Sequence, residues 1–249
     1  MESFHGRFAA RLAQPPPGAS RATLPVGFTR QEHMTCAPAT LATICRYWKR
    51  PAEHIAIADA ICYDGTSRLK ERAWAEEHGW AAREFTVTPE CARALIDSGI
   101  PFILSTVDPG AAHAQAVIGY DDLRGTLLIR DPYVRSKNEW IEEAAYKAQA
   151  CCGPRGMAIV PLGERSRLDR VPMPDAPAYD IMHQVDAALE RHDRAAAIAA
   201  LDRLARAYPD HRLTRLARLV IAGYDQHPVA AAAALEQQIA VHPDAVNAV

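Results

Sequence analysis

Cys36 is the residue best placed for covalent chemistry, because it stands where a helix is expected to begin. Pro38 favours the first turn of a helix, and the apolar spacing that continues to Trp48 is helical. Backbone N–H groups at a helix N-terminus lack partners within the helix and favour an anion. A cysteine there is stabilised as the thiolate, which is the nucleophilic form. Cys45 falls instead on the apolar face of the same helix.

A side-chain amide precedes this cysteine by five residues. Together with the backbone N–H of Cys36, Gln31 can donate a hydrogen bond to an oxyanion that develops on a substrate carbonyl. We therefore predict that Gln31 is an oxyanion donor.

A histidine and an aspartate flank a predicted β-hairpin. The expected strands run from His113 to Tyr120 and from Thr126 to Asp131. If Tyr120 pairs with Arg124, the register places His113 opposite Asp131 on the same face, whereas a slip of one residue would separate them. The pair then supplies a base and the carboxylate that orients it.

These motifs together resemble the bacteriocin-processing peptidase family. The resemblance rests on Gln-x4-Cys, on a histidine opening an apolar strand that ends in Gly-Tyr-Asp, and on Asp-Pro, and it covers about residues 24–162. Members are papain-like cysteine peptidases that cut leader peptides after a double glycine, usually as the N-terminal domain of an ABC transporter. The resemblance implies that Cys36 is the nucleophile, His113 the base, Asp131 its orienter and Gln31 the oxyanion-hole residue.

Some features leave other interpretations open. The family often has an acidic residue before the nucleophile and glycine after it, where this chain has Thr35 and Ala37, and helices follow instead of a transporter. Specificity for double glycine therefore stays open. The same site could serve an acyl-enzyme transferase of the transpeptidase or transglutaminase type, or the domain could be a non-catalytic module that binds a peptide or protein. His33 is a rival base, with Glu32 as its nearest carboxylate in sequence.

The elements expected around these residues follow an α+β order. They are helices over 39–48, 52–62, 67–78 and 89–98 and strands over 85–88, 101–106, 113–120, 126–131 and 157–161. We therefore predict a papain-like cysteine peptidase domain over residues 24–162, with an N-terminal nucleophile helix and an antiparallel sheet. Residues 1–23, which contain a run of prolines, are predicted to be a flexible segment.

An all-α helical-repeat domain is predicted to follow a linker. Residues 163–177 hold prolines among mixed charges and are expected to make few contacts, so residues 178–249 should be dispensable for the chemistry. The Pro209-Asp210 step recurs 34 residues later as Pro243-Asp244, which is the period of the tetratricopeptide repeat. We expect these helices to recruit a protein partner or the substrate, and the short array indicates a fragment of a longer repeat protein. A plain four-helix appendage is the alternative.

The composition of the 249-residue chain, with 49% hydrophobic and 23% charged residues, is that of an ordinary globular protein. A net charge of −2 without long runs of one sign gives no basis for binding nucleic acid or an anionic membrane. No apolar stretch is long enough for a membrane span and no secretory signal pattern is present, so a cytoplasmic location is expected. The six cysteines show no metal-ligand spacing, and neither a metal nor another cofactor is expected.

Overall fold

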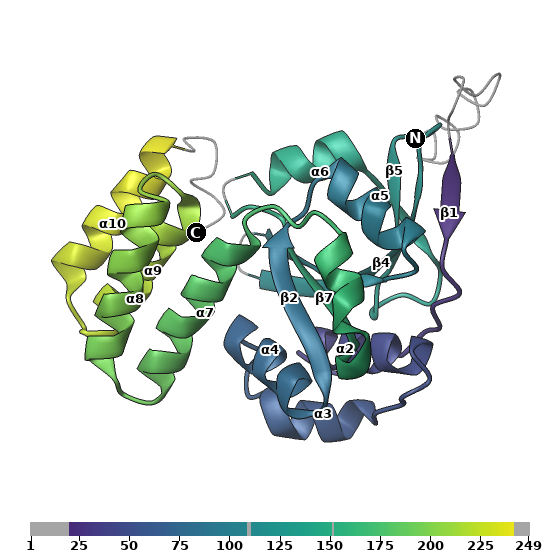
Figure 1. The fold of residues 1–249 in the computed structure, drawn as a ribbon, viewed down its shortest axis with the longest axis horizontal. Coiled ribbons are helices and arrows are strands. Elements are labelled where there is room, and N and C mark those ends of the chain that lie inside the picture. Colours follow the sequence, from purple (N-terminus) through teal and green to yellow (C-terminus); the bar gives the residue numbers. More distant parts are fainter. Residues whose placement is uncertain (1–19, 109–110, 151, 242–249) are drawn as a thin grey trace.

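The structure, a computed structural model of the chain, describes residues 20–108, 111–150 and 152–241. In chain order its elements are β1 (Arg21–Thr23), α2 (Cys36–Tyr47), α3 (His54–Ile61), α4 (Arg68–Glu77), β2 (Trp80–Thr86), α5 (Pro89–Asp97), β3 (Phe102–Asp108), β4 (Ala111–Asp121), β5 (Thr126–Arg130), β6 (Asn138–Ile141), α6 (Glu142–Ala148), β7 (Arg155–Pro161), the 3-10 helix η1 (Leu162–Arg170), α7 (Ala176–Glu190), α8 (Arg194–Ala207), α9 (Arg212–Tyr224) and α10 (Pro228–Val241). The fold is of the predicted α+β class, with helices first, then mostly strands, then a helical region (Figure 1).

The strands that the structure describes form one antiparallel sheet with the order β2-β7-β3-β4-β5-β6, and β1 pairs with β4. Helices cover both faces: apolar residues of α2, α3 and α4 pack on one face, and those of α5 and η1 on the other (Figure 1). Because both faces are buried, the central strands have continuous apolar runs, such as Phe102–Leu104, in place of an alternating pattern.

The sequence pattern missed β6 and α6 and placed the start of β2 at Phe85, whereas the strand begins at Trp80. Residues 81–83 are two alanines and an arginine, which are poor strand formers. β6 is a half-buried edge strand with polar residues, so its hydrophobic signal is weak.

The sequence predicts a flexible segment through residue 23, whereas Arg21–Thr23 form β1. Residues 1–19 lie outside the described residues. Since β3 pairs with β4 only as far as Val117, β4 has an open edge at Gly119–Asp121, and β1 pairs there. Glycine is needed for this approach, because a Cβ at position 119 would lie 2.3 Å from the carbonyl oxygen of Ala22. The predicted flexibility is therefore wrong for these strand residues.

The β4–β5 hairpin has a different register from the predicted one. Tyr120 pairs with Leu127 and not with Arg124, so the turn is wider than expected. Further along the hairpin Ala116 pairs with Arg130. The pairing shifts by one residue between these two points because β4 contains a β-bulge.

The bulge at Ile118 decides which side of the hairpin carries Asp131. Without it, the register at the turn would continue and place Asp131 opposite Ala116, on the other face from His113. With it, Asp131 falls opposite Gln115, two residues from His113 and on the same face. The predicted register is therefore wrong, while the predicted proximity of the two side chains is recovered through the bulge.

The sequence also predicts few contacts for residues 163–177, whereas this segment packs against the sheet. Leu168, Val171 and Ala176 are buried in the same apolar cluster as α5, and α7 lies against β2 (Figure 1). The apolar residues stand singly among charges and prolines, which hid their packing role from a pattern search. The division into two domains at this segment stays a proposal.

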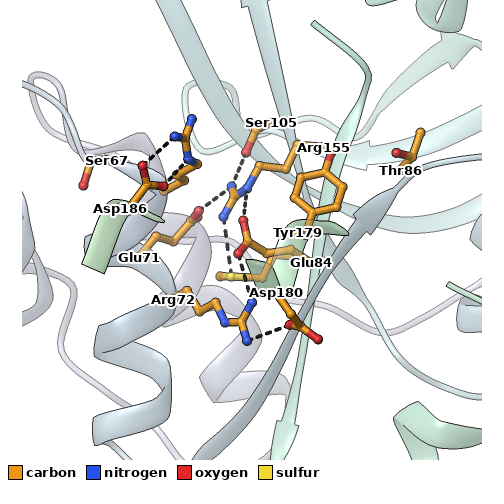
Figure 2. Close-up of polar contacts among 12 residues, drawn as sticks. Ser67, Glu71, Arg72, Glu84, Thr86, Ser105, Arg155, Tyr179, Asp180 and Asp186 are labelled. Carbon is orange, nitrogen blue, oxygen red and sulfur yellow. Dashed lines mark hydrogen bonds and ion pairs between the residues drawn. The ribbon is translucent and has the colours of Figure 1, made fainter. Parts of the chain in front are cut away.

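A buried ion-pair network joins α4 and the sheet to α7 (Figure 2). Arg155 on β7 contacts Glu71 on α4 and Glu84 on β2, each at 2.7 Å. Arg72 on α4 contacts Glu84 at 3.2 Å and Asp180 on α7 at 2.9 Å. Because Glu71 and Glu84 are almost fully buried, their charges depend on these arginines.

The C-terminal helices α7 to α10 match the four predicted helices closely in extent. α7, α8 and α9 share an apolar cluster around Tyr179, Met182 and Leu204. Pro243-Asp244, the second copy of the repeated step, lies outside the described residues, so the repeat stays a prediction. No helix in the described part of the chain has both the length and the apolar character needed to cross a membrane.

Candidate active site

Cys36 is the first residue of α2, as the sequence predicts. Its own N–H therefore has no intrahelical acceptor, and Pro38 in the first turn offers no N–H of its own. The Thr40 hydroxyl, one turn further on, donates a hydrogen bond of 3.1 Å to the carbonyl oxygen of Ala114. This bond ties the cysteine's helix to β4 directly beside His113.

His113 and Asp131 are joined by a hydrogen bond of 2.9 Å between Nε2 and Oδ1. The same carboxylate oxygen accepts a hydrogen bond of 2.8 Å from the backbone N–H of Tyr133. Burial by itself raises the pKa of the Asp131 carboxyl, but the bonds from His113 and Tyr133 outweigh burial and hold that pKa below its usual range. Asp131 is therefore a fixed, ionised partner for the imidazole.

His113 also contacts the Cys36 thiol, which completes a Cys-His-Asp arrangement. The hydrogen bond with Asp131, followed by the one with Cys36, raises the pKa of His113 from 6.5 to about 9, against the opposing effect of burial. The imidazolium is thus the favoured form at neutral pH. An imidazolium next to a cysteine stabilises a thiolate electrostatically.

Gln31 lies beside this arrangement. Its backbone N–H donates a hydrogen bond of 3.0 Å to the carbonyl oxygen of Pro132, which fixes it next to the residue that follows Asp131. Its side chain lines the same cleft as Cys36 and His113, and within the described residues its Oε1 atom has no hydrogen-bond partner. Gln31 therefore lies at the cleft beside Cys36 and His113, where its amide N–H is the group that an oxyanion would require.

No sequence pattern pointed to His54, which helps to position the loop before Cys36. Its Nε2 atom lies 2.9 Å from the hydroxyl oxygen of Thr35, and that hydroxyl accepts a hydrogen bond of 2.9 Å from the Glu32 N–H. Burial lowers the pKa of His54, which favours the neutral imidazole. The loop also contains Met34 in the left-handed region, with φ of 59°. These contacts hold a strained loop in place.

The rival base His33 is exposed on the cleft. Across residues 20–108, 111–150 and 152–241, no hydrogen bond or ion pair joins it to a carboxylate. No group of three or more His, Cys, Asp or Glu side chains in those ranges is arranged to hold a metal ion.

Gln31, Cys36 and His113 share a cleft with a volume of about 2000 Å³. Further lining comes from the α3–α4 loop, from the residues after β5, and from α7, α9 and α10. This volume exceeds that of typical small-ligand sites and is large enough for a segment of polypeptide.

Comparison with known families decides the assignment. The model of the Peptidase_C39 like family matches residues 23–151, which is more than half of the chain. The chain belongs to this family. The match contains the whole Cys-His-Asp arrangement and Gln31, and the papain-like cysteine peptidase fold is the one predicted for this region. No curated protein matches the chain.

Two solved structures are similar to this C39-like chain. One is the peptidase domain of Streptococcus ComA, a bi-functional ABC transporter involved in a quorum sensing pathway. It shares 17% identity with a TM-score of 0.44, over 55% of this chain and 98% of that one. The other is a double glycine motif protease from an AMS/PCAT transporter in complex with the leader peptide. It shares 21% identity with a TM-score of 0.43, over 59% of this chain and 98% of that one.

Proposed function

We propose that the chain is a cysteine peptidase that cleaves a peptide or protein substrate. Cys36 is the nucleophile, His113 the base, Asp131 its orienter and Gln31 an oxyanion donor. The observation that carries the proposal is the contact of His113 with both Cys36 and Asp131 in a member of a peptidase family.

The chemistry begins with attack of the Cys36 thiolate on the scissile carbonyl carbon. The backbone N–H of Cys36 and the Gln31 amide donate hydrogen bonds to the resulting oxyanion. The His113 imidazolium gives its proton to the leaving amine as the C–N bond breaks, which leaves a thioester on Cys36. Neutral His113 then takes a proton from water, whose oxygen attacks the thioester. The acid product departs, and Cys36 and His113 return to their starting forms.

The acid role of His113 sets the upper pH limit of this cycle. Below a pH of about 9 the imidazolium is present and can protonate the leaving amine. As the pH rises through that value the proton is lost, so turnover should decline on the alkaline side.

The direct test is cleavage of synthetic peptides by the full chain. Double glycine before the scissile bond is the first specificity to test, because the sequence motifs resemble those of leader peptidases. Peptides with a central Gly-Gly step and matched peptides with Val-Val in its place are incubated and analysed by mass spectrometry. Hydrolysis at one bond supports the proposal. Intact peptides in both sets, together with no adduct between Cys36 and a peptide aldehyde, contradict it.

Replacing Gln31 with alanine is expected to lower kcat by about 10²- to 10³-fold, which is typical for the loss of one oxyanion donor. The melting temperature should stay unchanged, because the Oε1 atom of this side chain has no hydrogen-bond partner among the described residues. Both are measured beside His33→Ala, which removes an exposed side chain from the same cleft and should keep full activity. Full activity in Gln31→Ala would remove the amide from the mechanism.

For the C-terminal region, we propose a role that is separate from catalysis. Residues 178–249 are proposed as tetratricopeptide-like repeats that follow a peptidase domain at residues 24–162. The 34-residue period and the close match of α7 to α10 with the predicted helices support this division.

A further inference from the structure

The catalytic cleft extends well beyond the sheet that carries His113. Side chains of the C-terminal helices line it together with the α3–α4 loop. The apolar ones that matter here are Leu189 on α7 and Leu216, Leu219, Val220 and Tyr224 on α9. We call these five residues the apolar wall.

α9 carries two apolar stripes, of which the structure buries one and leaves the other partly exposed. The first stripe is buried in the cluster shared with α7 and α8, and it consists of Leu213, Ala217 and Ile221. The second stripe has the same four-residue spacing and consists of Leu216, Val220 and Tyr224. Leu216 and Val220 are only partly buried, and Tyr224 is 39% exposed. Leu216 and Val220 also pack against the edge of that cluster, but part of each side chain stays exposed and, like Tyr224, lines the cleft. The second stripe therefore still offers apolar surface to another molecule.

Large apolar side chains also collect at the catalytic end of the same cleft. Tyr63 is fully exposed, Tyr133 is 73% exposed and Met34 is 42% exposed, and all three line the cleft. Exposed apolar side chains that gather around one cleft mark a binding surface. Both ends of the cleft therefore favour apolar side chains in whatever occupies it.

Charged residues where α4 faces α7 are already paired with one another. Arg68 binds Asp186 through two hydrogen bonds of 2.6 and 2.7 Å, and Lys70 pairs with Glu190. Because these charges are already paired with one another, this part of the cleft offers a ligand packing contacts and no unpaired charge from these residues.

We propose that the apolar wall binds an apolar-rich segment of the polypeptide substrate while Cys36 cleaves the same chain. This inference rests on the proposed peptidase function. The wall and Cys36 line one continuous cleft, so a polypeptide seated on the wall reaches the nucleophile without leaving it. The C-terminal helices then select the substrate directly, by forming part of its binding site.

Binding is measured in the Cys36→Ala chain, so that the peptides stay intact. The probes are two fluorescein-labelled peptides of equal length with a central Gly-Gly, which differ in having leucine or serine at the flanking positions. Fluorescence anisotropy should show about tenfold tighter binding of the leucine peptide. That preference should disappear when Leu216→Ser and Val220→Ser are combined. It should also weaken in Leu219→Ser, whose side chain is half-buried but does not pack on the α7–α9 cluster.

The matched control combines Ile198→Ser with Leu201→Ser on α8. These side chains have similar partial burial against the same cluster but do not line the cleft, so the leucine preference should persist. Any of three results would overturn the inference. The parent chain could bind the two peptides equally, it could bind neither of them, or the preference for the leucine peptide could survive in both wall variants. Cleavage by the chain that retains Cys36 is scored separately. Preferential binding of the leucine peptide without any cleavage would refute the proposed peptidase function but support the apolar wall. Cleavage without that binding preference would support the peptidase function but refute the role of the wall.

Discussion

Replacement of Cys36 with alanine is expected to lower kcat for peptide hydrolysis by about 10⁴-fold or more. The acyl-enzyme cannot form without the thiolate, so the remaining residues can only bind the peptide and polarise its carbonyl. The fold should be unaffected, because Cys36 is half-buried at the start of α2 and alanine is compatible with that position. Turnover of a Gly-Gly peptide and the melting temperature are measured on the full chain.

Cys62→Ala is the matched control for this prediction. Its thiol donates a hydrogen bond of 3.2 Å to the carbonyl oxygen of Met34, in the loop before Cys36, and it is half-buried as well. Cys62 follows the end of α3, so it lacks the helix N-terminus that favours a thiolate. Activity close to that of the parent chain is expected. A comparable loss in both variants, or retained activity in Cys36→Ala, would contradict the assignment of the nucleophile.

Replacement of Arg155 with methionine is expected to lower the free energy of unfolding by about 3–5 kcal/mol, the usual cost of removing one partner from a buried ion pair. The change leaves Glu71 and part of Glu84 without a partner in the interior (Figure 2). Urea denaturation near neutral pH measures the loss. Arg83→Met is the control, because the half-exposed Arg83 pairs with Asp180 only at the surface. This substitution should lower the free energy of unfolding by about 1 kcal/mol or less. Equal losses in the two variants would show that the buried network is not stabilising.

The decrease in the free energy of unfolding caused by Arg155→Met should also depend on pH. Burial alone raises the pKa of the Glu84 carboxyl, but Arg155 and Arg72 outweigh burial and hold that pKa below its usual 4.5. A lowered pKa in the folded state adds stability above the unfolded-state pKa, and this stability is lost as the pH falls toward the folded-state value. The difference between parent and variant should therefore narrow as the pH falls below about 4.5.

Local signals were sufficient to predict the elements around the nucleophile. Pro38 and the apolar spacing after it located the start of α2, and the regular helical periodicity after residue 177 located α7 to α10. These features depend on residues close in sequence, where propensity and periodicity are informative.

The remaining features depend on contacts between distant residues. No sequence pattern near Ile118 predicts the β-bulge that places Asp131 on the same face as His113. The apposition of His54 and Thr35 depends on how α3 packs, and the bonds of Arg155 depend on sheet order. The candidate site residues were therefore proposed from their types and order, while their supporting contacts needed the fold.

Competition among the thiols for a limiting amount of iodoacetamide, followed by peptide mapping, tests the assignment of the nucleophile most directly. At a pH of about 6.5, few ordinary thiols are ionised. Burial raises the pKa values of Cys45 and Cys91 to about 12, so both should stay unmodified. Cys36 adjoins an imidazolium whose pKa is about 9 and should be labelled first. Preferential labelling of Cys62, with Cys36 left intact, would contradict the assignment.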